Sequence, residues 1–215
     1  MNKGKIKINI NGQEIFCKEN FSIFDIAKIN NIEIPTLCYH LDLKLPNQYE
    51  ICIIEIEGNP KLQYAYSTQI TDGMRIKTNS KKVKDARKTA LEKIFKKHKR
   101  KCSNCIDLYH CKLLKLAATY GVRFQDIQPE KARDIIYKFG PSVVFDTSKC
   151  IDCGNCVISC AKQGIGFYTE KKNSNGENIV VPTENEKIDC IDCGQCINHC
   201  PVGAIYSKGE FEDIE

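Results

Sequence analysis

The sequence predicts an α+β chain of three successive parts, and three observations carry that prediction. Residues 1–78 contain short segments in which polar and apolar residues alternate, as in half-buried β-strands. Residues 79–140 have the spacing of amphipathic helices. Residues 141–215 contain a cysteine-rich sequence that occurs twice. A chain of 215 residues has room for two or three small domains of this kind.

Residues 1–78 predict a β-grasp arrangement, in which a sheet packs on one helix. The dipeptide Asn11-Gly12 separates two alternating segments and is typical of a two-residue hairpin turn. Ser22 is a favourable helix N-cap and predicts a helix that runs to about Asn30. The expected strands are Lys5–Ile10, Gln13–Cys17, Cys52–Glu57, Leu62–Ala65 and Met74–Lys77.

Residues 79–140 predict helices. Asn79 or Ser80 begins a helix that runs to about Lys99, with apolar residues on one face and many lysines on the other. Two further helices are expected at about Lys112–Tyr120 and Pro129–Phe139, because a glycine follows each of them. This part would connect the β-rich part to the cysteine repeat.

The 14 cysteines raise two alternatives, namely disulfides in a secreted protein or thiolates on a metal in an intracellular one. The N-terminus lacks the apolar core of a signal peptide, and no apolar run is long enough for a membrane helix. Most of the cysteines also stand in C-x-x-C runs. We therefore expect a reduced, cytoplasmic, metal-binding chain without a membrane span.

The run C-x2-C-x2-C-x3-C occurs twice and is the strongest signal in the sequence. Its spacing predicts two [4Fe–4S] clusters, each held by three cysteines of one run and by the last cysteine of the other. Structural zinc is the alternative, but the third cysteine of such a run has no role in a zinc site. One expected ligand set is Cys150, Cys153, Cys156 and Cys200, and the other is Cys190, Cys193, Cys196 and Cys160.

A second group of candidate ligands is His98, Cys102, Cys105 and Cys111, which fall within 14 residues. The residues alone leave three alternatives open. They suit a Cys3His zinc site and a [4Fe–4S] site equally well, and His98 is otherwise an ordinary polar residue of a basic helix.

Residues 141–215 resemble bacterial two-cluster ferredoxins, with Pro201 after the last cysteine and Gly203-Ala204-Ile205 beyond it. The spacing from His98 to Cys111, followed by Tyr120-Gly121-Val122, resembles the His-ligated segment of [FeFe] hydrogenases and of the large iron–sulfur subunit of complex I. Some formate dehydrogenases have the same segment. The resemblance covers nearly the whole chain in the same order, and it implies a third [4Fe–4S] cluster on His98, Cys102, Cys105 and Cys111.

In that family the first domain is a β-grasp ferredoxin with a [2Fe–2S] cluster, and here the sequence departs from the pattern. Cys38 and Cys52 stand at two of the four ligand places, whereas Tyr49 and Tyr66 stand at the other two. Phenolates are poor substitutes for thiolates. We therefore expect no [2Fe–2S] cluster, with Cys17, Cys38 and Cys52 as ordinary thiols and three [4Fe–4S] clusters in the whole chain.

The formal net charge of +5 counts every cysteine as neutral. Three loaded clusters contribute roughly −5, so the loaded protein should be close to neutral, and nucleic acid is not an expected partner. The segment from Lys81 to Lys101 is strongly basic. It is either a docking face for a small acidic ferredoxin or flavoprotein or a solvated helix face.

These observations predict an electron-transfer subunit that relays single electrons through three clusters. Its redox partner would be a catalytic subunit of hydrogenase, formate dehydrogenase or NAD(P)H–flavin type. Because only about 15 residues follow Cys200, we do not expect an enzyme. The alternatives are a free-standing soluble ferredoxin shuttle, a split or truncated [FeFe] hydrogenase half, and a zinc-binding interaction module.

Overall fold

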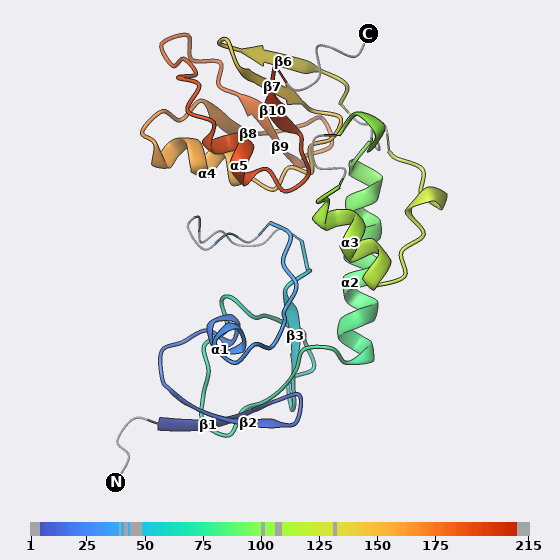
Figure 1. The fold of residues 1–215 in the computed structure, drawn as a ribbon, viewed down its shortest axis with the longest axis vertical. Helices are drawn as coiled ribbons and strands as arrows, with labels where there is room; N and C mark the ends of the chain where they lie inside the picture. Colours follow the sequence, from blue (N-terminus) through green and yellow to red (C-terminus); the bar gives the residue numbers. More distant parts are fainter. Residues whose placement is uncertain are drawn as a thin grey trace.

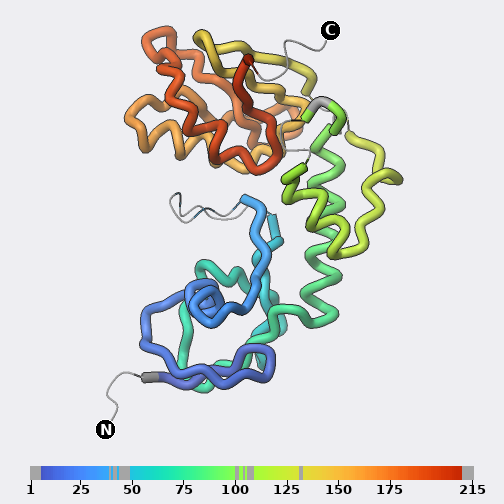
Figure 2. Tube along the Cα trace, in the orientation of Figure 1, coloured from blue at the N-terminus to red at the C-terminus, as the bar shows by residue number. Residues whose placement is uncertain are grey.

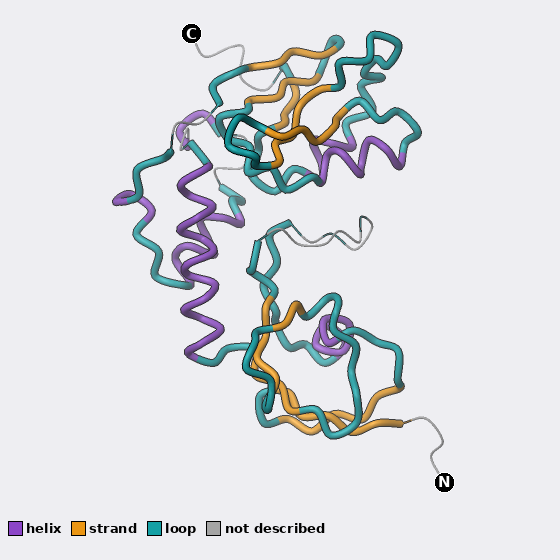
Figure 3. Tube along the Cα trace, turned by 180° about the vertical axis from the view of Figure 1, so that it is seen from behind, coloured by secondary structure: helices purple, strands orange, loops and turns teal. Residues whose placement is uncertain are grey.

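The computed structural model has a β-sheet domain at one end, a cysteine-rich α+β domain at the other, and a long helix beside both (Figure 1). Figure 3 gives the view from behind, in which this helix again lies between the two ends. The structure describes residues 5–38, 40, 43, 49–99, 102–105, 109–130 and 133–209.

The first domain is a mixed five-stranded sheet in the order β2-β1-β5-β3-β4. β1 and β5 are parallel, whereas the other neighbouring pairs are antiparallel. This sheet and its one helix form the expected β-grasp fold. The elements are β1 (Lys5–Ile10), β2 (Gln13–Lys18), α1 (Ile23–Ile29), β3 (Ile53–Ile56), β4 (Gln63–Tyr64) and β5 (Arg75–Lys77).

Local chemistry explains the start of this domain. Asn11 and Gly12 both have positive φ, at 53° and 92°, which is the geometry of a hairpin turn that matches strand twist. Ser22 and Asp25 form a capping box at the start of α1, so that two orphan N–H groups are satisfied reciprocally. The predicted hairpin and helix are therefore confirmed.

The helix α2 (Lys81–Lys97) begins at the N-cap Ser80 and buries one apolar stripe. α3 (Lys112–Thr119) packs beside it. Arg87 belongs to the buried stripe and donates to the carbonyls of Ile51 and Ile53, at 2.8 Å each, and to the Tyr120 hydroxyl at 2.9 Å. This guanidinium ties the β-grasp sheet to both helices.

The helix expected at Pro129–Phe139 is wrong. A short 3-10 turn, η2 (Phe124–Asp126), comes before that segment, and its end forms β6 (Ile136–Phe139). The side chains of β6 alternate between exposed and half-buried, and β-branched and aromatic residues favour a pleated strand. β6 pairs antiparallel with β7 (Val143–Asp146), and this tertiary pairing overrides the local helical pattern.

The third part contains two small antiparallel sheets, in the orders β10-β7-β6 and β8-β9, and two short helices. The polar segment 173–177 forms the turn between β8 and β9. The remaining elements are α4 (Asn155–Lys162), β8 (Tyr168–Lys172), β9 (Asn178–Pro182), α5 (Gln195–His199) and β10 (Ile205–Ser207).

Two hydrophobic cores hold the molecule together. One lies inside the β-grasp domain and consists mostly of isoleucines. The other joins α2 and α3 to the third part, and it also takes in Leu37, Cys38 and Ile51 from the first domain. Figure 2 shows the light-blue segment of the first domain rising toward the third part. Among the described helices, none combines the length and the apolar character needed to cross a membrane.

Candidate metal centres

The first candidate centre, called site I, is a cavity lined by Cys150, Cys153, Cys156 and Cys200. The first two cysteines lie in the loop before α4, the third lies in α4, and the fourth directly follows α5. The other walls of the cavity are mostly apolar, with Phe145, Ile151, Val180, Val202, Ala204 and Ile205 among them.

The second centre, called site II, is a cavity lined by Cys160, Cys190, Cys193 and Cys196. Cys160 comes from α4, whereas the other three come from the loop before α5 and its first turn. The structure thus brings together the same two groups of four thiols that the spacing of the repeat singles out. That each group binds a cluster stays a prediction.

The two cysteine loops need an unusual backbone. Asp152 and Gly154 have positive φ, at 56° and 76°, and Asp192 and Gly194 repeat this at 53° and 70°. Asp tolerates this region better than most residues, and Gly adopts it without steric cost. The left-handed turns curl the chain closely around each cavity.

Backbone N–H groups point at the sulfur atoms of both sites. The N–H of Ala204 lies 3.2 Å from Cys200 Sγ in site I, and the N–H of Phe167 lies 3.2 Å from Cys160 Sγ in site II. Such donors stabilise negative charge on sulfur. The two sites are therefore prepared for thiolate ligands.

Several of the crowded thiols have raised pKa values. Burial raises the pKa of Cys150 and Cys156 well above its usual range, and burial raises that of Cys200 to about 11. In site II, burial raises the pKa of Cys196 to about 11. Four thiolates in one apolar cavity repel one another, so they need a bound cation to ionise together. This donor set fits an iron–sulfur cube.

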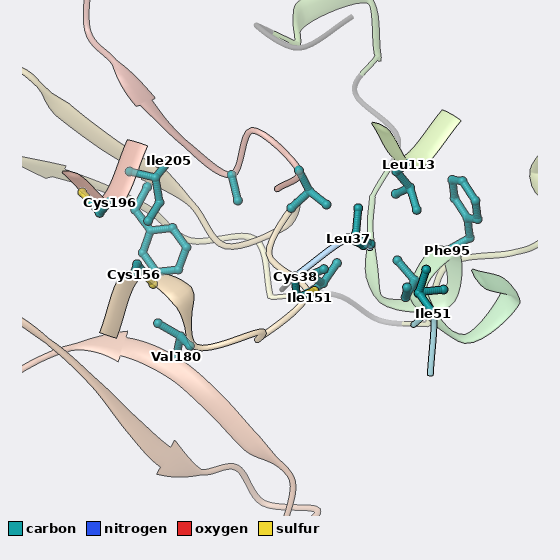
Figure 4. Close-up of a cluster of buried hydrophobic side chains, with 14 of the residues drawn as sticks. Leu37, Cys38, Ile51, Phe95, Leu113, Ile151, Cys156, Val180, Cys196 and Ile205 are labelled. Atoms are coloured by element: carbon teal, nitrogen blue, oxygen red, sulfur yellow. The ribbon is translucent and has the colours of Figure 1, made fainter. Parts of the chain in front are cut away.

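The first domain covers site I. Cys38 hydrogen-bonds with Cys153, and this contact, followed by burial, raises the pKa of the Cys153 thiol. The Tyr49 hydroxyl donates to the carbonyl of Ile151. Figure 4 shows Cys38 beside Ile151. Among the described residues, none gives site II a comparable cover: Cys193 is exposed, and the exposed fraction of Ile191 is 60%.

The third group of candidate ligands lies in the connection between α2 and α3. His98 is the buried C-cap of α2, Cys102 begins a short 3-10 turn, η1 (Cys102–Asn104), and Cys111 is the N-cap of α3. His98 Nδ1 lies 2.7 Å from the carbonyl oxygen of Lys149. With the proton on Nδ1, the ring lone pair belongs to Nε2, the nitrogen that would bind a metal. Cys105 follows η1 directly, and residues 106–108 lie outside the described part.

Sequence reasoning missed two polar residues at these sites. The Tyr168 hydroxyl in β8 donates to Cys196 Sγ at 3.7 Å in site II. Arg133 forms an ion pair with Asp152, inside the cysteine loop of site I. Neither residue belongs to the repeated run, so no spacing in the sequence pointed to them.

Three family models match this chain. The 4Fe-4S dicluster domain matches residues 149–205, and the NADH-ubiquinone oxidoreductase-G iron-sulfur binding region matches residues 87–126. The 2Fe-2S iron-sulfur cluster binding domain matches residues 3–81. Together they follow the three parts of the molecule in order.

Two curated relatives match nearly the whole chain. Iron hydrogenase 1 of Clostridium pasteurianum is 33% identical over 213 residues, which are 97% of this chain and 37% of the relative. A subunit of the NADH-quinone oxidoreductase of Rickettsia conorii is 32% identical over 205 residues, which are 94% of this chain and 30% of the relative. The chain corresponds to the N-terminal iron–sulfur region of these two families. It spans about a third of the length of these relatives.

A solved structure shares the fold of this iron–sulfur region. It is a chain of an NAD+-reducing [NiFe]-hydrogenase in the H2-reduced state, with a TM-score of 0.83 and 22% sequence identity. The match covers 96% of this chain and 89% of that one. At this identity the likeness establishes the fold alone, and it places all three parts in one known architecture.

The expectation that a [2Fe–2S] cluster is unlikely is wrong. Residues 3–81 match a domain that binds such a cluster, and the comparisons support one [2Fe–2S] and three [4Fe–4S] clusters. The error came from counting thiols at ligand spacing, whereas the family signal is spread over the whole domain. Cys38 and Cys52 face different cores, and the described residues of this domain do not gather four thiols at one point. Thiol spacing therefore does not identify the ligands of the [2Fe–2S] cluster.

Proposed function

We propose that this iron–sulfur region relays single electrons to or from a partner oxidoreductase through three [4Fe–4S] clusters, in addition to the [2Fe–2S] cluster of its first domain. The observation that carries the proposal is the pair of cavities, each lined by four thiols. The proposed ligands are Cys150, Cys153, Cys156 and Cys200 for site I; Cys160, Cys190, Cys193 and Cys196 for site II; and His98, Cys102, Cys105 and Cys111 for the third centre.

The chain's own residues do three things at these sites. Thiolates fix the position of the cofactor, apolar walls exclude water, and N–H groups such as those of Ala204 and Phe167 stabilise charge on sulfur. A bound [4Fe–4S] cluster supplies one-electron chemistry with little rearrangement. The protein therefore needs no moving part to pass an electron.

The sites are close neighbours along the chain. Cys156 lines site I and Cys160 lines site II, and the two are one turn apart on α4, about 6 Å along the helix axis. The third centre approaches site I through His98, whose ring contacts the carbonyl of Lys149, the residue before Cys150. This arrangement supports a relay in the order third centre, site I, site II.

The partner is proposed to be a catalytic subunit of hydrogenase, formate dehydrogenase or NAD(P)H–flavin type. Support comes from the relatives, which are named as a hydrogenase and as part of an NADH-quinone oxidoreductase. We place this protein in the cytoplasm, because eleven of its fourteen cysteines are proposed as thiolate ligands, and thiols stay reduced in that compartment. Anaerobic co-purification distinguishes a subunit, which retains a stoichiometric partner, from a free ferredoxin shuttle, which does not.

The relay itself is tested by anaerobic reduction with dithionite, followed by electron paramagnetic resonance at low temperature. The expected result is a set of reduced [4Fe–4S] signals that disappear when a one-electron acceptor is added. A protein that stays colourless, contains zinc and takes up no electrons would overturn the proposal. Hydrogen evolution by the pure chain would instead favour a split hydrogenase half.

A further inference from the structure

Arg133 connects the segment before β6 to the cysteine loop of site I. One guanidinium nitrogen, Nη2, forms an ion pair with Asp152, and the other, Nη1, donates to the carbonyl of Val180 at 2.7 Å. The Val180 N–H donates to the same Asp152 oxygen at 2.9 Å. Asp152 is thus held by β9 and by Arg133 together, in a nearly closed environment with an exposed fraction of 7%.

The backbone around Arg133 is fixed as well. Ile135 donates its N–H to the Thr147 hydroxyl at 3.0 Å, and the Thr147 N–H donates to the Ile135 carbonyl at 3.0 Å. Thr147 lies three residues before Cys150, so this contact joins the segment of Arg133 to the chain that leads into the cysteine loop of site I. The guanidinium is therefore a preorganised group whose planar fork needs little further ordering.

Site II lacks this arrangement at the equivalent residue. Asp192 occupies the same place in its loop and has almost the same φ as Asp152, 53° against 56°. Its carboxylate accepts from the neutral backbone N–H of Ser142 at 3.2 Å. The repeat therefore gives both loops an aspartate, but only the loop of site I gives it a cationic partner among the described residues.

The charge of Arg133 bears on reduction. An added electron makes a thiolate-bound cluster more negative, and a fixed positive charge in a poorly solvated wall stabilises that state. The Asp152 carboxylate lies against Cys150, whose Sγ accepts from the Asp152 N–H at 3.3 Å, and would have the opposite effect if it were alone. At site I the positive charge of Arg133 offsets the negative charge of Asp152, so the carboxylate does not disfavour reduction of the cluster.

We propose that Arg133 is a positioning residue that holds the Cys150–Cys153 loop through Asp152 and sets the reduction potential of site I separately from that of site II. The proposal rests on the proposed function, because it assumes a cluster in each cavity. It adds a determinant of potential that lies outside both cysteine runs.

The experiment is a double-mutant cycle on the full chain, read by redox titration with electron paramagnetic resonance. A Cys200→Ser variant first identifies the signal of site I by its loss. Arg133→Gln should then lower the potential of site I and leave site II unchanged, and Asp152→Asn should raise the potential of site I. The double variant R133Q/D152N should return close to the wild-type value, because both charges are removed together.

Asp192→Asn provides the matched control. In the R133Q background it should leave the site I potential lowered, since Asp192 has no contact with Arg133 in the described structure. If R133Q fails to load site I, then Arg133→Lys, which keeps the charge, should restore both loading and potential. Selective loss of site I with that rescue also supports the proposal.

Three outcomes overturn the proposal while leaving the relay intact: both potentials move together, neither moves, or D152N does not reverse the effect of R133Q. Loss of both clusters in R133Q without rescue by lysine also overturns it. A wild-type protein without iron in either cavity contradicts the proposed function instead, so the two failures are distinguishable.

Discussion

Sites I and II come from the same repeated run, yet their surroundings differ. Both cavities have four thiols and a left-handed loop. Site I is covered by Cys38 and Tyr49 of the first domain and clamped by Arg133. Site II has an exposed cysteine, Cys193. The repeat thus specifies the ligand set, whereas segments outside the repeat specify the environment of each set.

The largest expected effect comes from replacing the cysteine that each run contributes to the cluster of the other run. Cys200→Ser should remove or degrade the cluster of site I, although Cys200 belongs to the second run, and Cys160→Ser should do so for site II. Loss of a whole cube lowers the iron content by up to about four atoms per chain. Iron analysis with electron paramagnetic resonance measures this. If each variant damages the cluster of its own run, the crossed assignment is wrong.

The second effect is on the order in which iron is lost. Because Cys193 and Ile191 are exposed, an iron chelator with mild oxidant should reach site II several-fold faster than site I. The measurement is the decay of the two signals with time. Tyr49→Ala should open site I and so bring its decay rate closer to that of site II. Equal decay rates of the two sites in the wild type would contradict the claim that site I is better covered than site II.

A smaller effect is expected from Tyr168. Burial raises the pKa of its hydroxyl well above the usual range, so the group stays protonated and donates to Cys196. Tyr168→Phe removes one hydrogen bond to a ligand sulfur and should lower the potential of site II by ~10–50 mV. Redox titration measures the shift. Tyr137→Phe, at a ring that stacks on Phe145, is the control and should change neither potential.

The smallest expected effect is the difference in stability between alanine variants of the two loop glycines, Gly154 and Gly194. Alanine at Gly154 or Gly194 costs about 1–2 kcal/mol, because both residues have left-handed backbone. A Cβ at Gly154 would also lie 2.9 Å from a Glu170 carboxylate oxygen, whereas a Cβ at Gly194 would meet no atom within 4 Å. The G154A variant should therefore melt slightly below G194A, by a few tenths of a kcal/mol, since the Glu170 side chain can move. Thermal unfolding under anaerobic conditions tests this order, and the reverse order would count against it.

Much of the fold was predictable because its signals are local. Asn11-Gly12 predicted the first hairpin, and Ser22 predicted the start of α1. The helix predicted at Pro129–Phe139 failed because pairing of β6 with β7 is a tertiary interaction that no local window contains.

The residues of the candidate sites also fall into two groups, those that local spacing predicts and those that only the tertiary structure reveals. The spacing of the repeat groups the thiols that line each cavity, since three of the four come from one tight loop. Arg133, Tyr168 and Cys38 reach the sites from other segments, so only the folded chain reveals them. The first domain was predicted correctly, but its [2Fe–2S] cluster was wrongly excluded, because the match to the family extends over the whole domain and does not depend on two ligand positions alone.

The most direct test of the central claim is the amount of iron and acid-labile sulfide per chain in anaerobically purified protein. Three cubes and one [2Fe–2S] cluster predict about 14 iron atoms and about as many sulfides. Zinc without labile sulfide at the thiols of sites I and II would contradict the account, because those cavities would then hold no electron carrier.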